Sequence, residues 1–131
     1  SVCDILKISD NEIQWFSGKE DYTEGIHMLQ QTYQIPLILL SMGRDGSRAY
    51  YKDMLVEVPA FLQKNTIETT GAGDTFGACC LHHILKYGLD NLTKQQLKEM
   101  LTFANAAASI ITTRKGALRV MPSLEEIQRL L

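Results

Sequence analysis

The stretch that decides the fold of this chain reads Thr69-Thr70-Gly71-Ala72-Gly73-Asp74-Thr75-Phe76-Gly77-Ala78. Its small residues let the backbone turn tightly and approach a ligand closely. The turn leads into an apolar segment that predicts a helix from about Asp74 to Tyr87, stopped by Gly88. Because a helix start carries free N–H groups and the positive end of the helix dipole, this stretch predicts an anion site.

The amides of Ala72, Gly73 and Asp74 would form that site, in a way suited to a phosphate group in transfer. The carboxylate of Asp74 would then lie within reach of an attacking hydroxyl and accept its proton. Taken alone, Gly-x-Gly-Asp also fits a plain tight connection in which Asp74 is an ordinary carboxylate at a helix start. A dinucleotide-binding fingerprint is excluded because position 76 is Phe, and no G-x-x-x-x-G-K-[ST] motif occurs.

The segments before this stretch alternate between strand and helix patterns. Ser9 and Glu12 form a capping box that predicts a short helix after a strand at residues 5–8, and Asp21 can cap a second helix. Residues 37–40 are continuously apolar, as in a strand covered on both faces. A turn bounded by Gly43 and Gly46 follows, and then a hairpin of strands 48–51 and 55–58, with a further strand at residues 66–70.

Two more capping boxes follow the decisive stretch. Thr93 and Gln96 open a long helix toward Thr112, and Ser123 and Glu126 open a final helix. Strands separated by helices predict an α/β layered domain with a mostly parallel sheet and flanking helices. The helix at residues 74–87 is apolar almost all round, which predicts that it is buried.

The bulk composition is that of an ordinary globular domain and limits the function classes. The chain has 131 residues, 45% of them hydrophobic and 21% charged, with a net charge of −2. No basic stretch favours nucleic-acid binding, and no apolar run is long enough to span a membrane. Three cysteines, two of them adjacent, make a poor disulfide framework, so we expect a reducing, cytoplasmic compartment.

The decisive stretch closely resembles the second signature of the PfkB family of ribokinase-like carbohydrate kinases, Asp-Thr-x-Gly-Ala-Gly-Asp. Three other segments resemble family regions in the same order. Residues 4–12, with Ser9 and Glu12, are similar to the fructokinase form of the Asn-x-x-Glu region. Residues 41–47 are similar to the phosphate-contacting Thr-x-Gly-x-x-Gly turn, and residues 103–108 and 113–117 resemble the segments that frame the adenine.

The resemblance implies a role for each matching residue. Asp74 would be the catalytic base, and the backbone of Gly71, Ala72, Gly73 and Asp74 would form the anion hole. Nucleotide-binding residues would be Gly43 and Gly46 near the phosphates, Asn105 at the purine, and Gly116. Glu12 would belong to the magnesium network through water, although its place in a capping box explains it equally well. Asn105 could alternatively face solvent.

The family also implies ATP, Mg²⁺ and a small sugar as ligands, with fructose favoured because Ser9 replaces the commoner Asn, as in fructokinase-like members. Glu68 stands where the family signature opens with Asp, which puts a monovalent-cation site in doubt. We expect residues 1–131 to be the C-terminal, nucleotide-binding part of the kinase, without the N-terminal half that carries most of the sugar pocket. A truncated nucleotide-binding module and a kinase for ribose or 2-keto-3-deoxygluconate are the alternatives. A homodimer is possible for the full-length protein.

Overall fold

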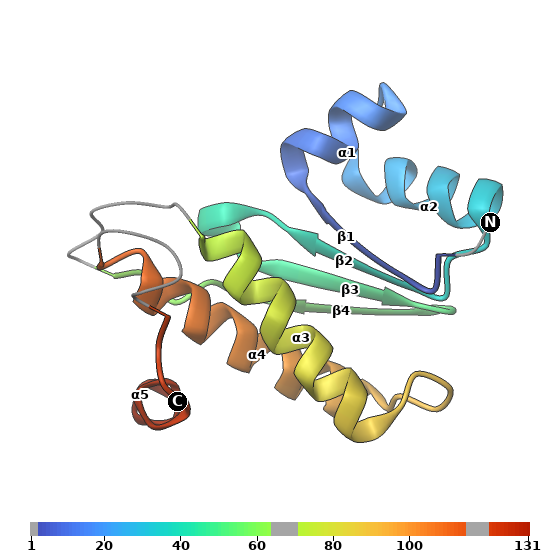
Figure 1. Ribbon diagram of the computed structural model, residues 1–131. Helices are drawn as coiled ribbons and strands as arrows, with labels where there is room; N and C mark the ends of the chain where they lie inside the picture. The colour runs from blue at the N-terminus through green and yellow to red at the C-terminus, as the bar shows by residue number, and fades with distance from the viewer. Residues whose placement is uncertain (1–2, 64–70, 115–120) are drawn as a thin grey trace.

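The chain folds into three layers, with a sheet between two pairs of helices (Figure 1). The computed structural model describes residues 3–63, 71–114 and 121–131. The sheet has the strand order β1-β2-β3-β4. Its strands are β1 (Ile5–Ser9), β2 (Leu37–Ser41), β3 (Ser47–Tyr51) and β4 (Met54–Val58). The helices are α1 (Asp10–Ser17), α2 (Tyr22–Tyr33), α3 (Ala72–Tyr87), α4 (Lys94–Ile111) and α5 (Leu124–Leu130).

The four strands form a mixed sheet. β1 pairs with β2 in parallel, whereas β3 pairs with β2 and with β4 in antiparallel fashion. Three strands therefore run in one direction, as expected of a mostly parallel sheet, but the reversed β3 makes two of the three described pairings antiparallel. The predicted α/β class and the predicted hairpin are both confirmed. The further strand predicted at residues 66–70 lies outside the described residues.

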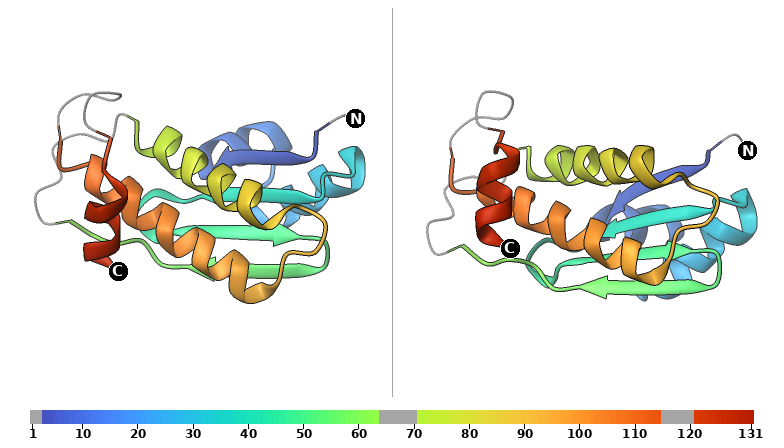
Figure 2. Two further views of the ribbon diagram at one scale, coloured as in Figure 1. Left: turned by 60° about the horizontal axis from the view of Figure 1, so that its bottom comes forward. Right: turned by 90° about the horizontal axis from the view of Figure 1, so that it is seen from below.

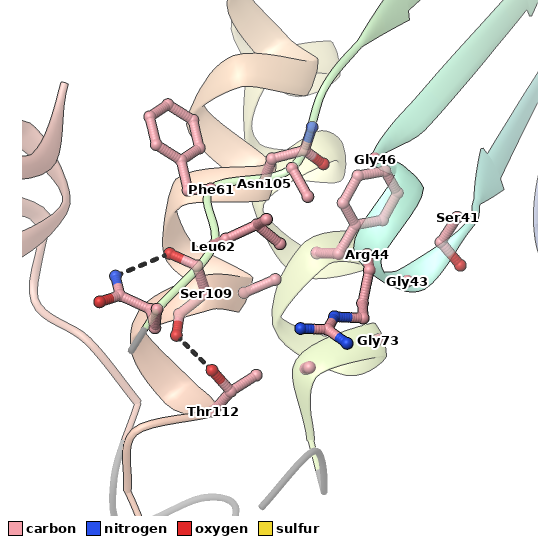
Figure 3. Close-up of a pocket in the computed structure, with 15 residues that line it drawn as sticks. Ser41, Gly43, Arg44, Gly46, Phe61, Leu62, Gly73, Asn105, Ser109 and Thr112 are labelled. Carbon is pink, nitrogen blue, oxygen red and sulfur yellow. Dashed lines mark hydrogen bonds between the residues drawn. The ribbon is translucent and has the colours of Figure 1, made fainter. Parts of the chain in front are cut away.

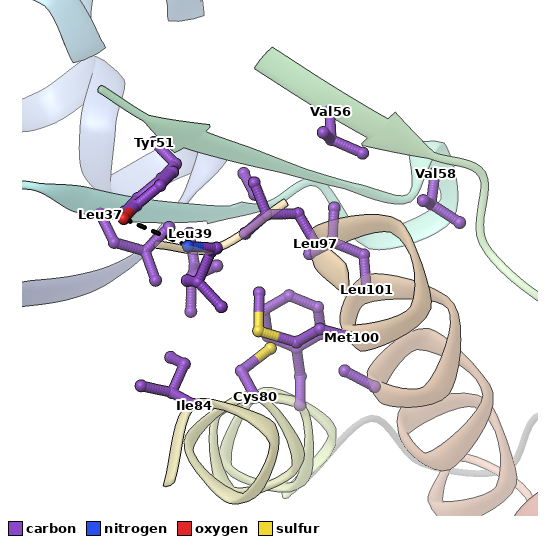
Figure 4. Packing of buried hydrophobic residues seen from close by; sticks show 14 residues of the cluster. Leu37, Leu39, Tyr51, Val56, Val58, Cys80, Ile84, Leu97, Met100 and Leu101 are labelled. Carbon is purple, nitrogen blue, oxygen red and sulfur yellow. Dashed lines mark hydrogen bonds between the residues drawn. The ribbon is translucent and has the colours of Figure 1, made fainter. Parts of the chain in front are cut away.

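β2 is buried on both faces, as its unbroken apolar sequence predicts. Leu37 and Leu39 point toward α3 and α4, where they join the larger hydrophobic cluster, shown in Figure 4. Ile38 and Leu40 point the other way, toward α1 and α2. Because successive side chains of a strand alternate between faces, one apolar run supplies both cores. Figure 2 shows α3 and α4 lying side by side across their face of the sheet.

All three predicted capping boxes are formed. Ser9, Thr93 and Ser123 each accept a hydrogen bond from the backbone N–H three residues on, and the Glu or Gln at that position returns one. Such reciprocal bonds satisfy donors that every helix start leaves without an internal partner. Local sequence therefore determines where these helices begin.

The predicted burial of α3 is wrong for one of its faces. Phe76, Cys80 and Ile84 are buried against the core, but Leu81 is 49% exposed and Leu85 is 87% exposed. A helix that is apolar on all faces is fully buried only if neighbouring elements cover every face. In the described residues, α4 and the sheet cover one side of α3 and leave the other open.

The far end of the β3–β4 hairpin is attached to the loop between α3 and α4. The Tyr51 hydroxyl donates to the carbonyl of Leu89 at 2.5 Å and accepts from the N–H of Leu92 at 3.4 Å. The ammonium of Lys52 donates to the carbonyl of Asp90 at 2.8 Å. We call this set of contacts the hairpin clasp. It fixes the end of α3 that lies away from Asp74.

Candidate functional site

The candidate site begins at the first turn of α3. Gly71 precedes the helix with φ 82° and ψ −5°, a left-handed conformation that glycine adopts without steric cost. The helix begins at Ala72, two residues earlier than predicted, so Asp74 lies in its first turn rather than at its start. No side chain caps this end. Among the described residues, nothing accepts a hydrogen bond from the amides of Ala72, Gly73 or Asp74, and these donors remain available.

Asp74 itself is exposed, and its carboxylate has no hydrogen-bond or ion-pair partner in the described part of the chain. The next residue, Thr75, is buried, and its N–H donates to the carbonyl of Gly71 at 2.9 Å. The backbone of the turn is therefore fixed from inside while the carboxylate faces outward. This arrangement suits a group that acts on a ligand more than one that supports the fold.

A pocket of about 540 Å³ opens beside this turn (Figure 3). Its volume lies in the range of small-molecule and cofactor sites. Four segments line it: the turn after β2, the segment after β4, the first turns of α3, and the second half of α4. The lining residues are Ser41, Gly43, Arg44, Gly46, Ala60, Phe61, Leu62, Gln63, Ala72, Gly73, Phe76, Asn105, Ala108, Ser109 and Thr112.

The structure brings most of the predicted nucleotide residues together at this pocket. Gly43, Gly46 and Asn105 line it with Ala72 and Gly73, although they are separated by up to 62 positions in sequence. Other predicted residues do not line it. Asp74, Gly71 and Glu12 lie outside the lining, and Gly116 and Glu68 fall outside the described residues.

The two glycines of the β2–β3 turn (3₁₀ turn Gly43–Asp45) serve different physical purposes. Both have positive φ, 54° at Gly43 and 97° at Gly46. A Cβ added at Gly46 would lie 2.2 Å from the carbonyl oxygen of Val58, whereas one added at Gly43 would meet nothing within 4 Å. Gly46 thus permits close approach of the turn to the end of β4, while Gly43 only permits the turn.

Asn105 is buried and its amide is fully engaged by the protein. Its Oδ1 accepts from the hydroxyl of Ser47 at 2.8 Å. Its Nδ2 donates to the carbonyls of Val58 and Pro59 at 3.2 and 3.1 Å. The alternative that Asn105 faces solvent is wrong, since its side chain is only 7% exposed. Contact with a purine stays a prediction, because these bonds use both amide hydrogens.

Glu12 is exposed, and its carboxylate takes part in the capping box by accepting a hydrogen bond from the Ser9 N–H. Hydrogen bonds from the backbone and side chain of Ser9 lower the pKa of Glu12, and the nearby positive charge of Lys7 lowers it further. In residues 3–63, 71–114 and 121–131, no group of three or more His, Cys, Asp or Glu side chains could hold a metal ion. A metal role for Glu12 would therefore depend on oxygens supplied by a ligand.

The cysteines on α3 are not candidate nucleophiles. Burial raises the pKa of Cys79 to about 11. Burial, with a smaller contribution from neighbouring Cys79, raises the pKa of Cys80 as well. The thiolate is the reactive form of cysteine, and burial disfavours that form in both side chains.

Comparison with known families decides the assignment. The profile of the pfkB family carbohydrate kinases matches residues 1–124. The chain belongs to the PfkB family. Among curated relatives, Fructokinase-1 of Zea mays is 32% identical over 128 residues, covering 98% of this chain and 39% of the relative. The fructokinase of Klebsiella pneumoniae is 33% identical over 130 residues, covering 98% of this chain and 41% of the relative.

Solved structures of PfkB-type kinases share the fold. The fructokinase of Vibrio cholerae O395, in a form bound to fructose, ADP and calcium ion, superposes with a TM-score of 0.85 at 26% identity. That alignment covers 98% of this chain and 41% of the other. Ribokinase of Thermotoga maritima gives a TM-score of 0.81 at 25% identity, covering 97% of this chain and 41% of that one. The predicted ribokinase-like fold is confirmed, and the chain spans about two fifths of the relatives it matches. None of the described helices is long and apolar enough to cross a membrane.

The motifs of the PfkB family did not predict two cationic side chains near the first turn of α3. Arg44 lines the pocket, and the ammonium of Lys7 lies 3.0 Å from where a Cβ on Gly73 would be. A signal for Lys7 exists in the sequence, because lysine is unusual in the middle of an apolar strand. Arg44 carries no such signal, since charged residues are ordinary in exposed turns.

Proposed function

We propose that this chain is the C-terminal, nucleotide-binding part of an ATP-dependent sugar kinase, with Asp74 as its general base. One observation carries the proposal: the uncapped first turn of α3 presents free amides and an unpartnered carboxylate at the edge of the pocket. In this proposal the pocket holds ATP. Its walls are mostly apolar, as a purine requires, and its open amides lie at one end, as a polyphosphate requires.

The chemistry proposed for the first turn is an in-line transfer. The hydroxyl oxygen of the sugar forms a bond to the terminal phosphorus of ATP while the bond from that phosphorus to the bridging oxygen of ADP breaks. Asp74 accepts the proton of the attacking hydroxyl. The amides of Ala72 and Gly73 donate to the oxygens of the group in transfer, where negative charge must be stabilised. The dipole of α3 adds to this stabilisation.

When bound, magnesium would supply positive charge that offsets the negative charge of the phosphates. Glu12 is the candidate to hold it through water, because its carboxylate is exposed and ionised at neutral pH. The capping box uses this carboxylate to accept from the Ser9 N–H at 2.7 Å. A carboxylate has further lone pairs beyond that bond, so the cap and a water ligand are compatible.

The sugar class proposed is a small sugar, with fructose first. Fructokinases from plants and bacteria are the relatives that support this choice, at 32–33% identity. Ribose and 2-keto-3-deoxygluconate are the alternatives.

The test is sugar-dependent ADP release by the full gene product that carries this chain. The panel is fructose, ribose, glucose and 2-keto-3-deoxygluconate. We expect turnover with fructose, and a loss of about 10²–10⁴-fold in kcat for Asp74→Asn, the usual contribution of general base catalysis. Asp90→Asn is the matched control, since Asp90 is an exposed aspartate just beyond the other end of α3. It should turn over at the rate of the unchanged protein.

Three results would change the assignment in different ways. Turnover with another sugar of the panel would correct the substrate and leave the mechanism standing. An Asp74→Asn variant nearly as fast as the unchanged protein would remove Asp74 as the base. Binding of ADP without turnover on any sugar would favour a nucleotide-binding module that does not catalyse phosphorylation.

A further inference from the structure

The last helix of the chain lies behind one wall of the pocket. α5 runs beside the second half of α4 (Figure 2), where its buried Ile127 packs against Ala106 and Ala107. Phe61 packs against the same cluster and also lines the pocket. None of the described lining residues belongs to α5 itself. This helix therefore contacts the pocket only through the side chains that form its wall.

Glu126 connects α5 to the end of α4 through an ion pair. Its Oε1 accepts from the guanidinium of Arg114 at 2.7 Å, and its Oε2 accepts from the N–H of Ser123 at 2.8 Å. The hydrogen bond from Arg114 is the largest cause that lowers the pKa of Glu126, and the bond from Ser123 is the next. The same carboxylate thus caps α5 and fixes that helix to α4.

The position of Arg114 is linked to the pocket by backbone hydrogen bonds. Thr112, two residues earlier, lines the pocket. The N–H of Thr113 donates to the carbonyl of Ile110 at 3.0 Å, and the N–H of Arg114 donates to that of Ile111 at 3.1 Å. These bonds continue the turn beyond the end of α4. Of the three ion pairs between described residues, the pair of Arg114 with Glu126 is the one that joins two helices.

We propose that Glu126 is a positioning residue for nucleotide binding and that it acts through Arg114. The ion pair holds the end of α4 where Ser109 and Thr112 line the pocket. A wall that is already fixed loses less conformational freedom when a ligand binds, and affinity rises accordingly. The inference rests on the proposed function. It concerns affinity rather than the transfer step, because the groups proposed to act in transfer are on the first turn of α3.

The nucleotide affinity of Glu126→Gln tests this role. Glutamine can keep the cap, since Gln96 fills the same place in the capping box of α4, but it removes the charge that faces Arg114. The probe is ADP with magnesium, titrated calorimetrically into the full gene product. We expect the Kd for ADP to rise about 2–5-fold, because a partly exposed ion pair has a modest effect. In turnover, KM for ATP should rise by a similar factor, while kcat and the KM for the sugar stay unchanged.

Glu125→Gln is the matched control for Glu126→Gln. Glu125 is the preceding residue of the same helix, and its carboxylate pairs with Arg129 at 3.2 Å within α5. The control loses the same charge without releasing α4, so it should bind ADP as the unchanged protein does.

Two variants of Arg114 approach the ion pair from the side of α4. Arg114→Gln should give the same rise in Kd, and it keeps the test decisive should Glu126→Gln fail to fold. The charge swap that combines Arg114→Glu with Glu126→Arg restores the pair in reverse. It should bind ADP more tightly than either of its two substitutions alone, a rescue that a general loss of stability would not produce.

The possible outcomes separate this role from the proposed function. If Glu126→Gln keeps the Kd for ADP of the unchanged protein, or if Glu125→Gln raises it equally, the positioning role is wrong even when sugar turnover is normal. A lower kcat at unchanged KM for ATP would also overturn it. If Glu126→Gln weakens ADP binding as expected but no sugar is phosphorylated, the kinase proposal fails and the positioning role stands. If the unchanged protein binds neither ATP nor ADP, both fail.

Discussion

The two walls of the pocket differ in how their polar groups are used. In the wall built from the β2–β3 turn, the segment after β4 and α4, Asn105 accepts from Ser47, which lies behind the lining, and donates to the carbonyls of Val58 and Pro59 at the end of β4. In the wall built from the start of α3, the amides of Ala72 and Gly73 lack partners among the described residues, and so does the carboxylate of Asp74 just outside the lining. We call these the paired wall and the open wall. The family motifs therefore matched two kinds of residue. Some use their polar groups to stabilise the pocket, and others keep them available to bind a ligand.

The largest effect on the paired wall should come from Gly46→Ala. A Cβ at this position would lie 2.2 Å from the Val58 carbonyl oxygen and 2.8 Å from Cα of Pro59, so backbone must move. Positive φ adds a further penalty for alanine. Together we expect a loss of roughly 2–5 kcal/mol in the free energy of unfolding, measured by urea denaturation.

Gly43→Ala is the matched control for Gly46→Ala. It shares the positive φ but has no atom within 4 Å of the added Cβ. We expect it to cost only about 1–2 kcal/mol, the penalty for a left-handed backbone alone. If both variants lose the same unfolding free energy, the close approach of Gly46 to the end of β4 does not contribute to the cost of Gly46→Ala.

A smaller effect is expected for Asn105→Ala, which would remove the acceptor of the Ser47 hydroxyl and a donor to the carbonyls of Val58 and Pro59. We expect a loss of about 1–3 kcal/mol in unfolding free energy, with weaker ADP binding as a consequence of the loosened wall. Ser47→Ala removes only one of these bonds and should cost less. Lost ADP affinity at unchanged stability would instead move Asn105 to the open wall, as a direct ligand of the purine.

The smallest effect concerns Glu12, whose carboxylate serves a cap and is proposed to serve a metal. Its lowered pKa means that ionised Glu12 stabilises the folded chain above the ordinary pKa of a glutamate, and that this contribution is lost as the pH falls through the lowered value. Because the side chain is mostly exposed, solvent screening limits the contribution to a few tenths of a kcal/mol.

Urea unfolding of Glu12→Gln at pH 7 and at successively lower pH measures this contribution. The variant should be slightly less stable at pH 7, and the difference should shrink as the pH falls through the lowered pKa of Glu12. A pH-independent difference would contradict the link to ionisation. If Glu12 also holds magnesium through water, the variant needs more magnesium for half-maximal turnover, and an unchanged requirement would confine Glu12 to its cap.

Features determined by neighbours in sequence could be predicted well. The three capping boxes, the doubly buried β2 and the hairpin depend on residues within a few positions of each other, and all are present. The family motifs likewise identified the turn at Gly43 and Gly46 and the first turn of α3, both of which meet at the pocket.

Features that depend on distant neighbours could not be predicted. The exposed face of α3, with Leu85, follows from where α4 and the sheet lie, which periodicity does not report. The contact of Lys7 with the turn at Gly73 joins residues 66 positions apart. The bonds of Asn105 reach back 46 to 58 positions, so its motif could indicate a place in the pocket but not the use of its amide.

The hairpin clasp has a consequence for how this chain tolerates insertions. Surface loops such as residues 88–93 ordinarily accept added residues with little cost. Here Leu89, Asp90 and Leu92 are bonded to Tyr51 and Lys52 at the end of β3. The opposite end of β3 is Ser47, the partner of Asn105. Lengthening this loop would therefore disturb β3 and, through Ser47, the pocket at its other end, so we expect the loop's length to be conserved more strictly than its exposure suggests.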